Sequence, residues 1–166
     1  MGYYNDDYCC RGTRFTFQIP PVTPGIINFA DFFATMPPDN AVAVAPGSNV
    51  LFPSTGANGG TAITRLTTST FNLATIGTYM VQFQVSVTQA GQLVLTLNGT
   101  ELAYTVAGRA NGIDQITGMA LVTTTTPNSV LTLRNPIGNI GSLTITPSAG
   151  GASAVTAHLV ILKLTP

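Results

Sequence analysis

Charged residues are scarce in this chain of 166 residues: six acidic and six basic side chains make up 7% of it and leave no net charge. A typical soluble protein carries about a quarter of its residues as charges. Nucleic acid is not expected as a partner, because binding phosphates needs a basic surface. The length fits one domain with a full hydrophobic core plus an arm, and is short for two domains.

Long apolar runs are also missing, since Thr, Gln or Gly interrupts every candidate before it reaches the roughly 18 to 20 residues of a membrane span. No membrane partner is therefore expected. The N-terminal residues lack the basic and then apolar order of a signal peptide. We expect a chain that is made in a cytoplasm and does not leave by the general secretion route.

Residues suited to catalysis are few and scattered. His158 is the single histidine, and with no acid near it in sequence it is better interpreted as a structural residue than as part of a triad. The segment Gly56–Gly60 lacks the Lys and the following helix of a phosphate-binding loop. The acidic residues of the body share no motif; they are Asp31, Asp39, Glu101 and Asp114. We expect no catalytic residue, no metal site and no cofactor, and only a concave polar pocket near His158 would favour an enzyme.

The segment Gly77–Val87 shows the clearest pattern in the chain. β-Branched and aromatic residues alternate strictly with polar ones, which predicts a long central strand. One face would carry Tyr79, Val81, Phe83, Val85 and Val87, and the other Thr78, Met80, Gln82, Gln84 and Ser86. The second face is polar but uncharged, which suggests partial burial against another subunit rather than full exposure to water.

The remainder of the body is rich in threonine and is punctuated by Gly, Pro, Asn and Ser, as in an all-β protein with many turns. Further strands are expected at 26–33, 41–45, 49–52, 63–66, 70–73, 92–97, 102–106, 113–126, 130–134, 143–146 and 155–164. Asn98-Gly99 predicts a hairpin turn, and 54–60 and 147–153 are expected to be loops. No segment has a convincing helical period, so the pattern favours a β-sandwich, most plausibly a jelly roll.

Residues 1–25 differ from the body, residues 26–166, and form an expected arm and spacer. The arm holds four of the twelve charges, five aromatic residues and both cysteines. Within it, Arg14, Thr16 and Gln18 alternate with Phe15, Phe17 and Ile19. This alternation predicts a strand that can add to a sheet edge and place its rings in pockets. Three prolines and Gly25 then form a semi-rigid spacer. The alternative is a disordered tag.

The two cysteines, Cys9 and Cys10, are adjacent. Neighbouring cysteines rarely pair with each other, because disulfide geometry favours Cα atoms about 5.5 Å apart. The chain has no third cysteine, so an oxidised pair must find its partners on other copies of the chain. Free thiols remain an alternative, and so does metal binding, although the spacing does not match that of zinc sites.

Five segments of the body closely resemble one known domain. They are Phe29–Ala41 (FADFFATMPPDNA), Val44–Gly47 (VAPG), Gly77–Tyr79 (GTY), Phe83–Val87 (FQVSV) and Gly91–Gly99 (GQLVLTLNG). Over about residues 28–165 the chain resembles the C-terminal domain of collagen-like spore-surface glycoproteins (the BclA type) of Gram-positive spore formers.

That domain is similar in fold to the complement C1q and tumour necrosis factor group, in which Gly77-x-Tyr79 opens the core strand of a trimeric jelly roll. The resemblance implies a C1q/TNF-like homotrimer whose polar, uncharged strand faces pack around a threefold axis. The residues expected at the trimer core are Tyr79, Gln82, Phe83 and Gln84. It also implies a rigid, non-enzymatic role on the spore surface.

The N-terminus departs from that family, because no collagen-like Gly-x-y stalk precedes the domain. Instead, Tyr8-Cys9-Cys10 and the segment Arg14–Ile19 resemble the N-terminal connector of bacterial endospore appendage subunits. In those fibres a short Cys-Cys arm docks into a neighbouring subunit and is locked by disulfides.

These resemblances together imply a structural subunit of a spore-surface fibre, made in the mother-cell cytoplasm and located in the exosporium or an appendage. Trimers would be linked head-to-tail by arms inserted into the neighbouring trimer. The expected partners are other copies of the chain and a spore-coat or exosporium anchor protein. The alternative is an arm-anchored trimeric binding or adhesion module of the exosporium, which a cluster of aromatic residues in an exposed loop would favour.

Overall fold

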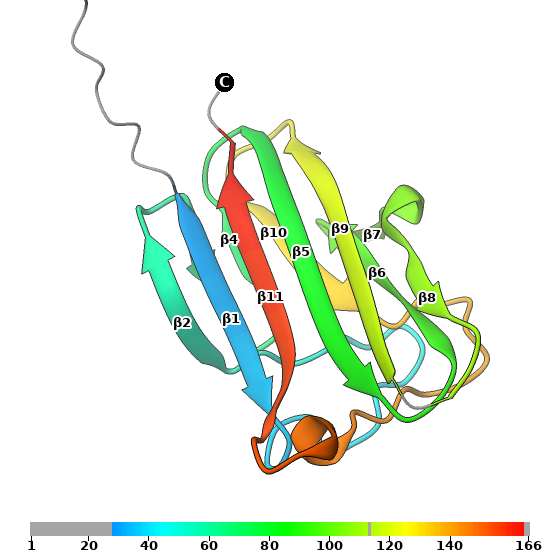
Figure 1. The fold of residues 1–166 in the computed structure, drawn as a ribbon. Coiled ribbons are helices and arrows are strands. Elements are labelled where there is room, and N and C mark those ends of the chain that lie inside the picture. Colours follow the sequence, from blue (N-terminus) through cyan, green and yellow to red (C-terminus); the bar gives the residue numbers. More distant parts are fainter. Residues whose placement is uncertain (1–27, 113, 165–166) are drawn as a thin grey trace, which may run out of the picture.

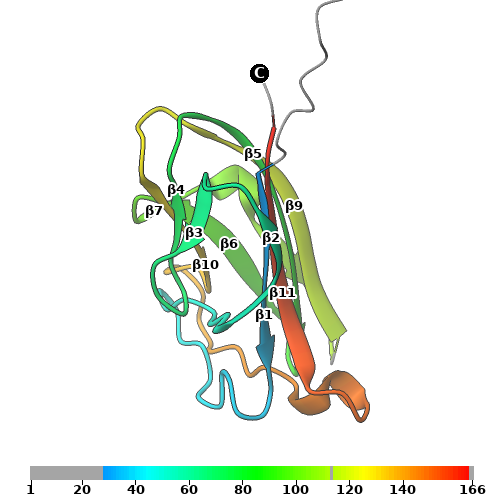
Figure 2. The same ribbon diagram turned by 90° about the vertical axis from the view of Figure 1, so that its left-hand side faces the viewer.

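The chain folds into two antiparallel β-sheets packed face to face, in a computed structural model that describes residues 28–112 and 114–164 (Figure 1, Figure 2). The first sheet has the order β2 (Ser54–Gly59), β1 (Phe29–Thr35), β11 (Val155–Lys163), β5 (Gly77–Val87) and β9 (Asp114–Thr124). The second has the order β3 (Ile63–Arg65), β4 (Phe71–Leu73), β10 (Ser129–Arg134), β6 (Gly91–Leu97) and β7 (Thr100–Glu101), and β8 (Ala107–Arg109) pairs with β6.

Two short 3₁₀ helices lie in the connections, η1 (Ala103–Thr105) and η2 (Pro147–Gly150). Among the described residues, no helix is long and apolar enough to cross a membrane. The expected all-β sandwich is confirmed.

The central strand β5 has the predicted bounds and the predicted faces. It pairs with β11 on one side and with β9 on the other, so it lies inside the first sheet. Its five inward side chains are at most 1% exposed and belong to the core between the sheets. The rings of Phe32 on β1 and Phe71 on β4 join the two sheets, with centroids 4.5 Å apart. Among the described residues, the core extends from Ala30 to Ile161.

Strand β2 was expected to be a loop, and that prediction is wrong. Ser, Gly, Ala and Asn have low strand propensity, but this segment forms a ladder with β1 in which Gly59 pairs with Phe29 and Ser54 with Phe33. A Cβ at Gly59 would lie 2.7 Å from Cε1 of Phe29. The missing side chain therefore makes room for the ring, and backbone pairing rather than propensity stabilises the strand.

Three predicted strands are reduced to isolated bridges. Residues 41–45 and 49–52 contain one isolated bridge each, Val44 with Leu143 and Asn49 with Arg134. Residues 143–146 add a bridge between Ile145 and Val87. Val44, Leu143 and Ile145 are nevertheless buried. Their apolar character thus reflects burial in the core rather than membership of a long ladder.

The hairpin turn at Asn98-Gly99 is confirmed, with φ of 51° and 84°, and it joins β6 to β7. The strand expected at 102–106 is instead mostly η1. Thr105 stabilises this turn, because its hydroxyl accepts a hydrogen bond from the Leu95 amide at 3.0 Å and donates one to the Leu102 carbonyl at 2.8 Å.

The described chain begins and ends at the same end of the sandwich, where β1 and β5 begin and β9 and β11 end (Figure 1). The Lys163 amide donates to the Asn28 carbonyl at 2.8 Å, and the Leu164 amide donates to the Thr78 carbonyl at 2.9 Å. We call this end of the sandwich the arm end. Residues 1–27, with Cys9, Cys10 and the predicted strand 14–19, lie outside the described residues.

Candidate interaction face

The outer surface of the first sheet is the candidate functional site, and we call it the outer face. It is built by every second residue of four neighbouring strands, since side chains alternate between the two sides of a sheet. It consists of Phe29, Asp31 and Phe33 on β1, His158, Val160 and Leu162 on β11, Thr78, Met80, Gln82 and Gln84 on β5, and Thr117, Met119, Leu121 and Thr123 on β9.

Half of these fourteen side chains are apolar, and five of the others are hydroxyls or amides without charge. Met119 and Leu121 on the edge strand β9 are 69% and 56% exposed in the single chain. Monomeric soluble proteins seldom leave a contiguous apolar patch of this kind open to water. The outer face therefore has the composition of a surface that another protein covers.

The remaining two side chains, His158 and Asp31, are the ionisable groups of this face, and they pair with each other. Nδ1 of His158 lies 3.2 Å from Oδ1 of Asp31, with the side chains 41% and 29% exposed. The ring of Phe33 packs beside the imidazole, with centroids 5.9 Å apart. Sequence reasoning missed this acid because it lies 127 residues away in the chain, and only the β1–β11 pairing brings the two together.

A shallow hollow of about 190 Å³ lies next to His158 on this face, and it is lined by Gln82, Phe83, Gln84, His158 and Val160. Its lining contributes side-chain amides and apolar groups but no serine, threonine or cysteine that the imidazole could activate as a nucleophile. The groups gathered here are therefore better suited to contact with a protein surface than to acyl transfer.

The four predicted trimer-core residues divide between the two faces of β5. Gln82 and Gln84 lie on the outer face, as expected, and are exposed and half-buried respectively. For Tyr79 and Phe83 the expectation is wrong, because these side chains point into the sandwich and are 0% and 1% exposed. The Tyr79 hydroxyl donates to the Thr75 carbonyl at 2.6 Å. Side chains buried within one subunit are not available to contact another.

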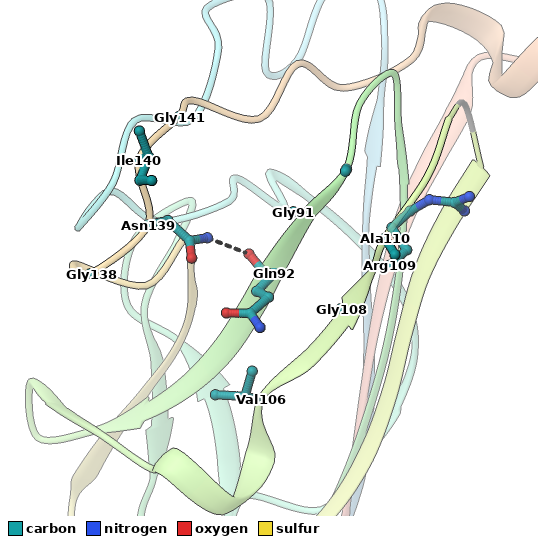
Figure 3. Close-up of a pocket in the computed structure, with 11 residues that line it drawn as sticks. Gly91, Gln92, Val106, Gly108, Arg109, Ala110, Gly138, Asn139, Ile140 and Gly141 are labelled. Atoms are coloured by element: carbon teal, nitrogen blue, oxygen red, sulfur yellow. Dashed lines mark hydrogen bonds between the residues drawn. The ribbon is translucent and has the colours of Figure 1, made fainter.

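A larger hollow lies elsewhere, between β6, β8 and the loop 138–141, and has a volume of about 730 Å³ (Figure 3). Asn139 crosses it, and its side-chain amide donates to the Gln92 carbonyl at 3.4 Å. At one side Arg109 pairs with Asp114 at 2.7 Å and donates through Nε to the Asn111 carbonyl at 2.8 Å. The eleven lining residues include no aromatic side chain.

Comparison with known proteins bears on the fold. Murine APRIL is similar in structure: in its crystal structure at pH 8.0 the TM-score is 0.56 with 12% identity, over 83% of this chain and 99% of that one. Its structure at pH 5.0 gives a TM-score of 0.55 with 8% identity, over 83% and 99%. Pika GITRL gives a TM-score of 0.48 with 10% identity, over 84% of this chain and 97% of that one.

No protein-family model matches the chain, and no curated protein matches it in sequence. At 12% identity or below, the likeness to APRIL establishes the fold alone. The predicted C1q/TNF-like jelly roll is thus confirmed.

Proposed function

We propose that this chain is the structural subunit of a spore-surface fibre, in which homotrimers are linked head-to-tail by N-terminal arms. The observation that carries the trimer is the outer face, which is nearly free of charge and rich in exposed apolar side chains. The spore surface, as the location, is supported by the resemblance of the segments quoted above. The arm as the linking element is supported by its strand pattern and by its two adjacent cysteines.

The outer face suits a homotrimer for a physical reason. Burying an unpaired charge at an interface is costly, and the ionisable groups of this face, His158 and Asp31, already partner each other. Met119 and Leu121 would be withdrawn from water, while Gln82 and Gln84 supply donors and acceptors to the neighbouring subunits. A closed ring of three copies would cover the part of this face built by β5 and β9 on every subunit, and would leave the second sheet outside.

The position of the arm end sets the polarity of the assembly. Cyclic symmetry places equivalent points of the three subunits at the same end of the trimer, so all three arms would leave from the arm end. A contact between these arms and the body of another trimer joins two different surfaces. Such a heterologous contact does not close on itself and produces a filament.

The cysteines would make the filament covalent. Since Cys9 and Cys10 are the two cysteines of the chain, every disulfide between copies joins one arm to another arm. Such links restrict dissociation without any contribution from the folded body.

The proposal is tested by negative-stain electron microscopy of the full chain beside a variant that lacks residues 1–19. Because the core of the described body lies between Ala30 and Ile161, the variant is expected to keep the fold. Fibres from the full chain and discrete particles from the variant are expected. If both preparations contain only isolated trimers, the fibre proposal is wrong. Immunogold labelling of intact spores would test the location.

The second candidate, a trimeric binding module anchored by the arm, is favoured by the hollow between β6, β8 and the loop 138–141. Its volume suits a small ligand, and the Arg109 guanidinium in its lining is already paired with Asp114. Aromatic platforms on which sugars commonly stack are absent from its lining, so the fibre remains the better supported function. Isolated trimers from the full chain, together with retention of a glycan on an array, would reverse this preference.

A further inference from the structure

Strand β2 is an open and unprotected edge of the first sheet. Among the described residues it pairs with β1 and with no other strand. Proteins usually protect such edges with bulges, Lys, Pro or inward-pointing charges. Strand β2 reads Ser-Thr-Gly-Ala-Asn-Gly and carries none of these side chains, and its ladder with β1 shifts register once, between Ala30 and Phe32. Its backbone groups on the free side are available to another strand.

A hollow of about 290 Å³ lies beside this edge, between β2 and the edge strand β3 of the second sheet. Ala30, Phe32 and Ile63 give its lining an apolar part, whereas Thr55, Asn58, Gly60, Thr64 and Arg65 give it a polar part. A strand added to β2 would direct every second side chain toward this hollow. Residues with large apolar side chains at alternate positions are therefore the ones that the site accepts best.

We propose that β2 receives residues 14–19 of a neighbouring copy as a sixth strand of the first sheet, with Phe15 and Phe17 facing the hollow. The inference rests on the proposed fibre and names the surface that accepts the arm. The small side chains of β2 complement the bulky alternate residues of the incoming segment, and both segments are six residues long.

The direction of the chain favours a neighbour's arm over the chain's own. Strand β2 runs toward the arm end, since Gly59 pairs with Phe29 at the start of β1. The arm of a trimer stacked below in the same orientation would enter from the opposite end, so that its residues 14–19 run antiparallel to β2. An arm that folded back on its own body would run parallel to β2. Antiparallel pairing is the more stable of the two.

The spacer has the length that this arrangement needs. Residues 20–27 link the docked strand to Asn28, and eight extended residues span up to about 26 Å. That length is the largest gap between two stacked trimers that the spacer could bridge. The prolines of the spacer also oppose the tight reversal that docking on the chain's own body would require.

Charge supports the same orientation. With Phe15 and Phe17 directed inward, Arg14 lies on the outward side of the added strand. Asp31 is the acid on that side of the sheet, and its side chain leans over β2: a Cβ at Gly56 would lie 2.8 Å from Oδ2 of Asp31. A register that sets Arg14 opposite Gly56 would bring Arg14 of one copy within reach of Asp31 of the next.

The test is charge reversal in the full chain, with Arg14→Asp and Asp31→Arg prepared as separate proteins. Each variant alone juxtaposes like charges at every docked arm. An exposed charge contributes about fivefold in affinity at most, but three arms acting together raise the effect on assembly to about a hundredfold. The concentration needed for fibres, measured by sedimentation and electron microscopy, should rise accordingly. In a mixture of the two variants, opposite charges are restored at each junction where one variant docks on the other. Fibres should therefore form at a lower concentration than either variant needs alone.

Recovery in the mixture separates docking from a structural effect, because the loss of the His158 partner in Asp31→Arg persists there. Arg11→Asp, outside the proposed strand, is the matched control and should polymerise normally. If both variants polymerise like the wild type, or if the mixture fails to recover, docking on β2 is wrong while the fibre itself stands. If the wild-type chain forms no fibres, the proposed function fails.

In that last case binding of a labelled peptide decides the docking proposal separately. A fluorescein-labelled peptide of residues 11–20 is titrated into the chain that lacks residues 1–19. Binding that weakens about fivefold in the Asp31→Arg body, and recovers with an Arg14→Asp peptide, supports the site. No binding to the wild-type body overturns it.

Discussion

Substitution of Leu121 by Asp is the sharpest test of the outer face as the trimer interface. Leu121 projects from the edge strand β9 and is 56% exposed in the single chain. Full burial of a leucine side chain stabilises by about 1.5 to 3 kcal/mol, so covering the exposed part contributes roughly 1 to 1.5 kcal/mol per subunit. Three copies per trimer bring the loss to about 3 to 5 kcal/mol, before the cost of burying a carboxylate is added.

Trimer dissociation should therefore be favoured by at least about a hundredfold in Leu121→Asp. The folded subunit itself should hardly change, because surface substitutions usually alter stability by less than about 0.5 kcal/mol. Size-exclusion chromatography with light scattering measures the oligomer over a dilution series, and urea unfolding checks the subunit.

Leu66→Asp is the matched control, since Leu66 is also 56% exposed but lies beyond β3, on the second-sheet side. It should leave the trimer intact. The reasoning is refuted if Leu121→Asp retains the wild-type mass at every dilution, or if Leu66→Asp dissociates to the same extent.

Two further predictions concern packing and the arm. Gly118→Ala should destabilise the subunit by about 1 to 3 kcal/mol in urea unfolding, because the new Cβ would lie 2.3 Å from Cζ of Phe83. Gly141→Ala is the control, since a Cβ at Gly141 has no atom within 4 Å. It should change stability by less than about 0.5 kcal/mol. Replacing Cys9 and Cys10 by Ser should leave fibres visible by electron microscopy. On a non-reducing denaturing gel the wild type should run as disulfide-linked multimers, and the variant as single chains. A wild type that also runs as single chains would indicate free thiols.

Much of the fold could be predicted from residue patterns. Strand β5 has its predicted bounds because its alternation continues over eleven residues, and the Asn98-Gly99 turn follows from the ease with which both residues adopt positive φ. Strand β2 was missed because its residues have little strand propensity and pair only through the ladder with β1. Residues 41–45 were assigned to a strand on apolar character, but within this segment Val44 alone is buried in the core, and it pairs through a single bridge.

The candidate site was predicted in part. Gln82 and Gln84 were correctly placed on an uncharged surface, since alternation along β5 determines which side chains share a face. Tyr79 and Phe83 share the opposite face, and the alternation alone should have excluded them from an intersubunit contact. The pairing of His158 with Asp31 had no local signal, because the two residues become neighbours only through the β1–β11 ladder.

The sequence by itself determined that this chain is an all-β sandwich with a central strand of two unlike faces, because the two-residue period of a strand is a local property. It also determined that disulfides between copies can join only arms, because Cys9 and Cys10 are the two cysteines present. The tertiary structure decided which strands are neighbours, and hence that Met119 and Leu121 extend the uncharged face of β5 and that β2 is left as an open edge. Strand order depends on contacts between residues far apart in the chain, which no local pattern encodes.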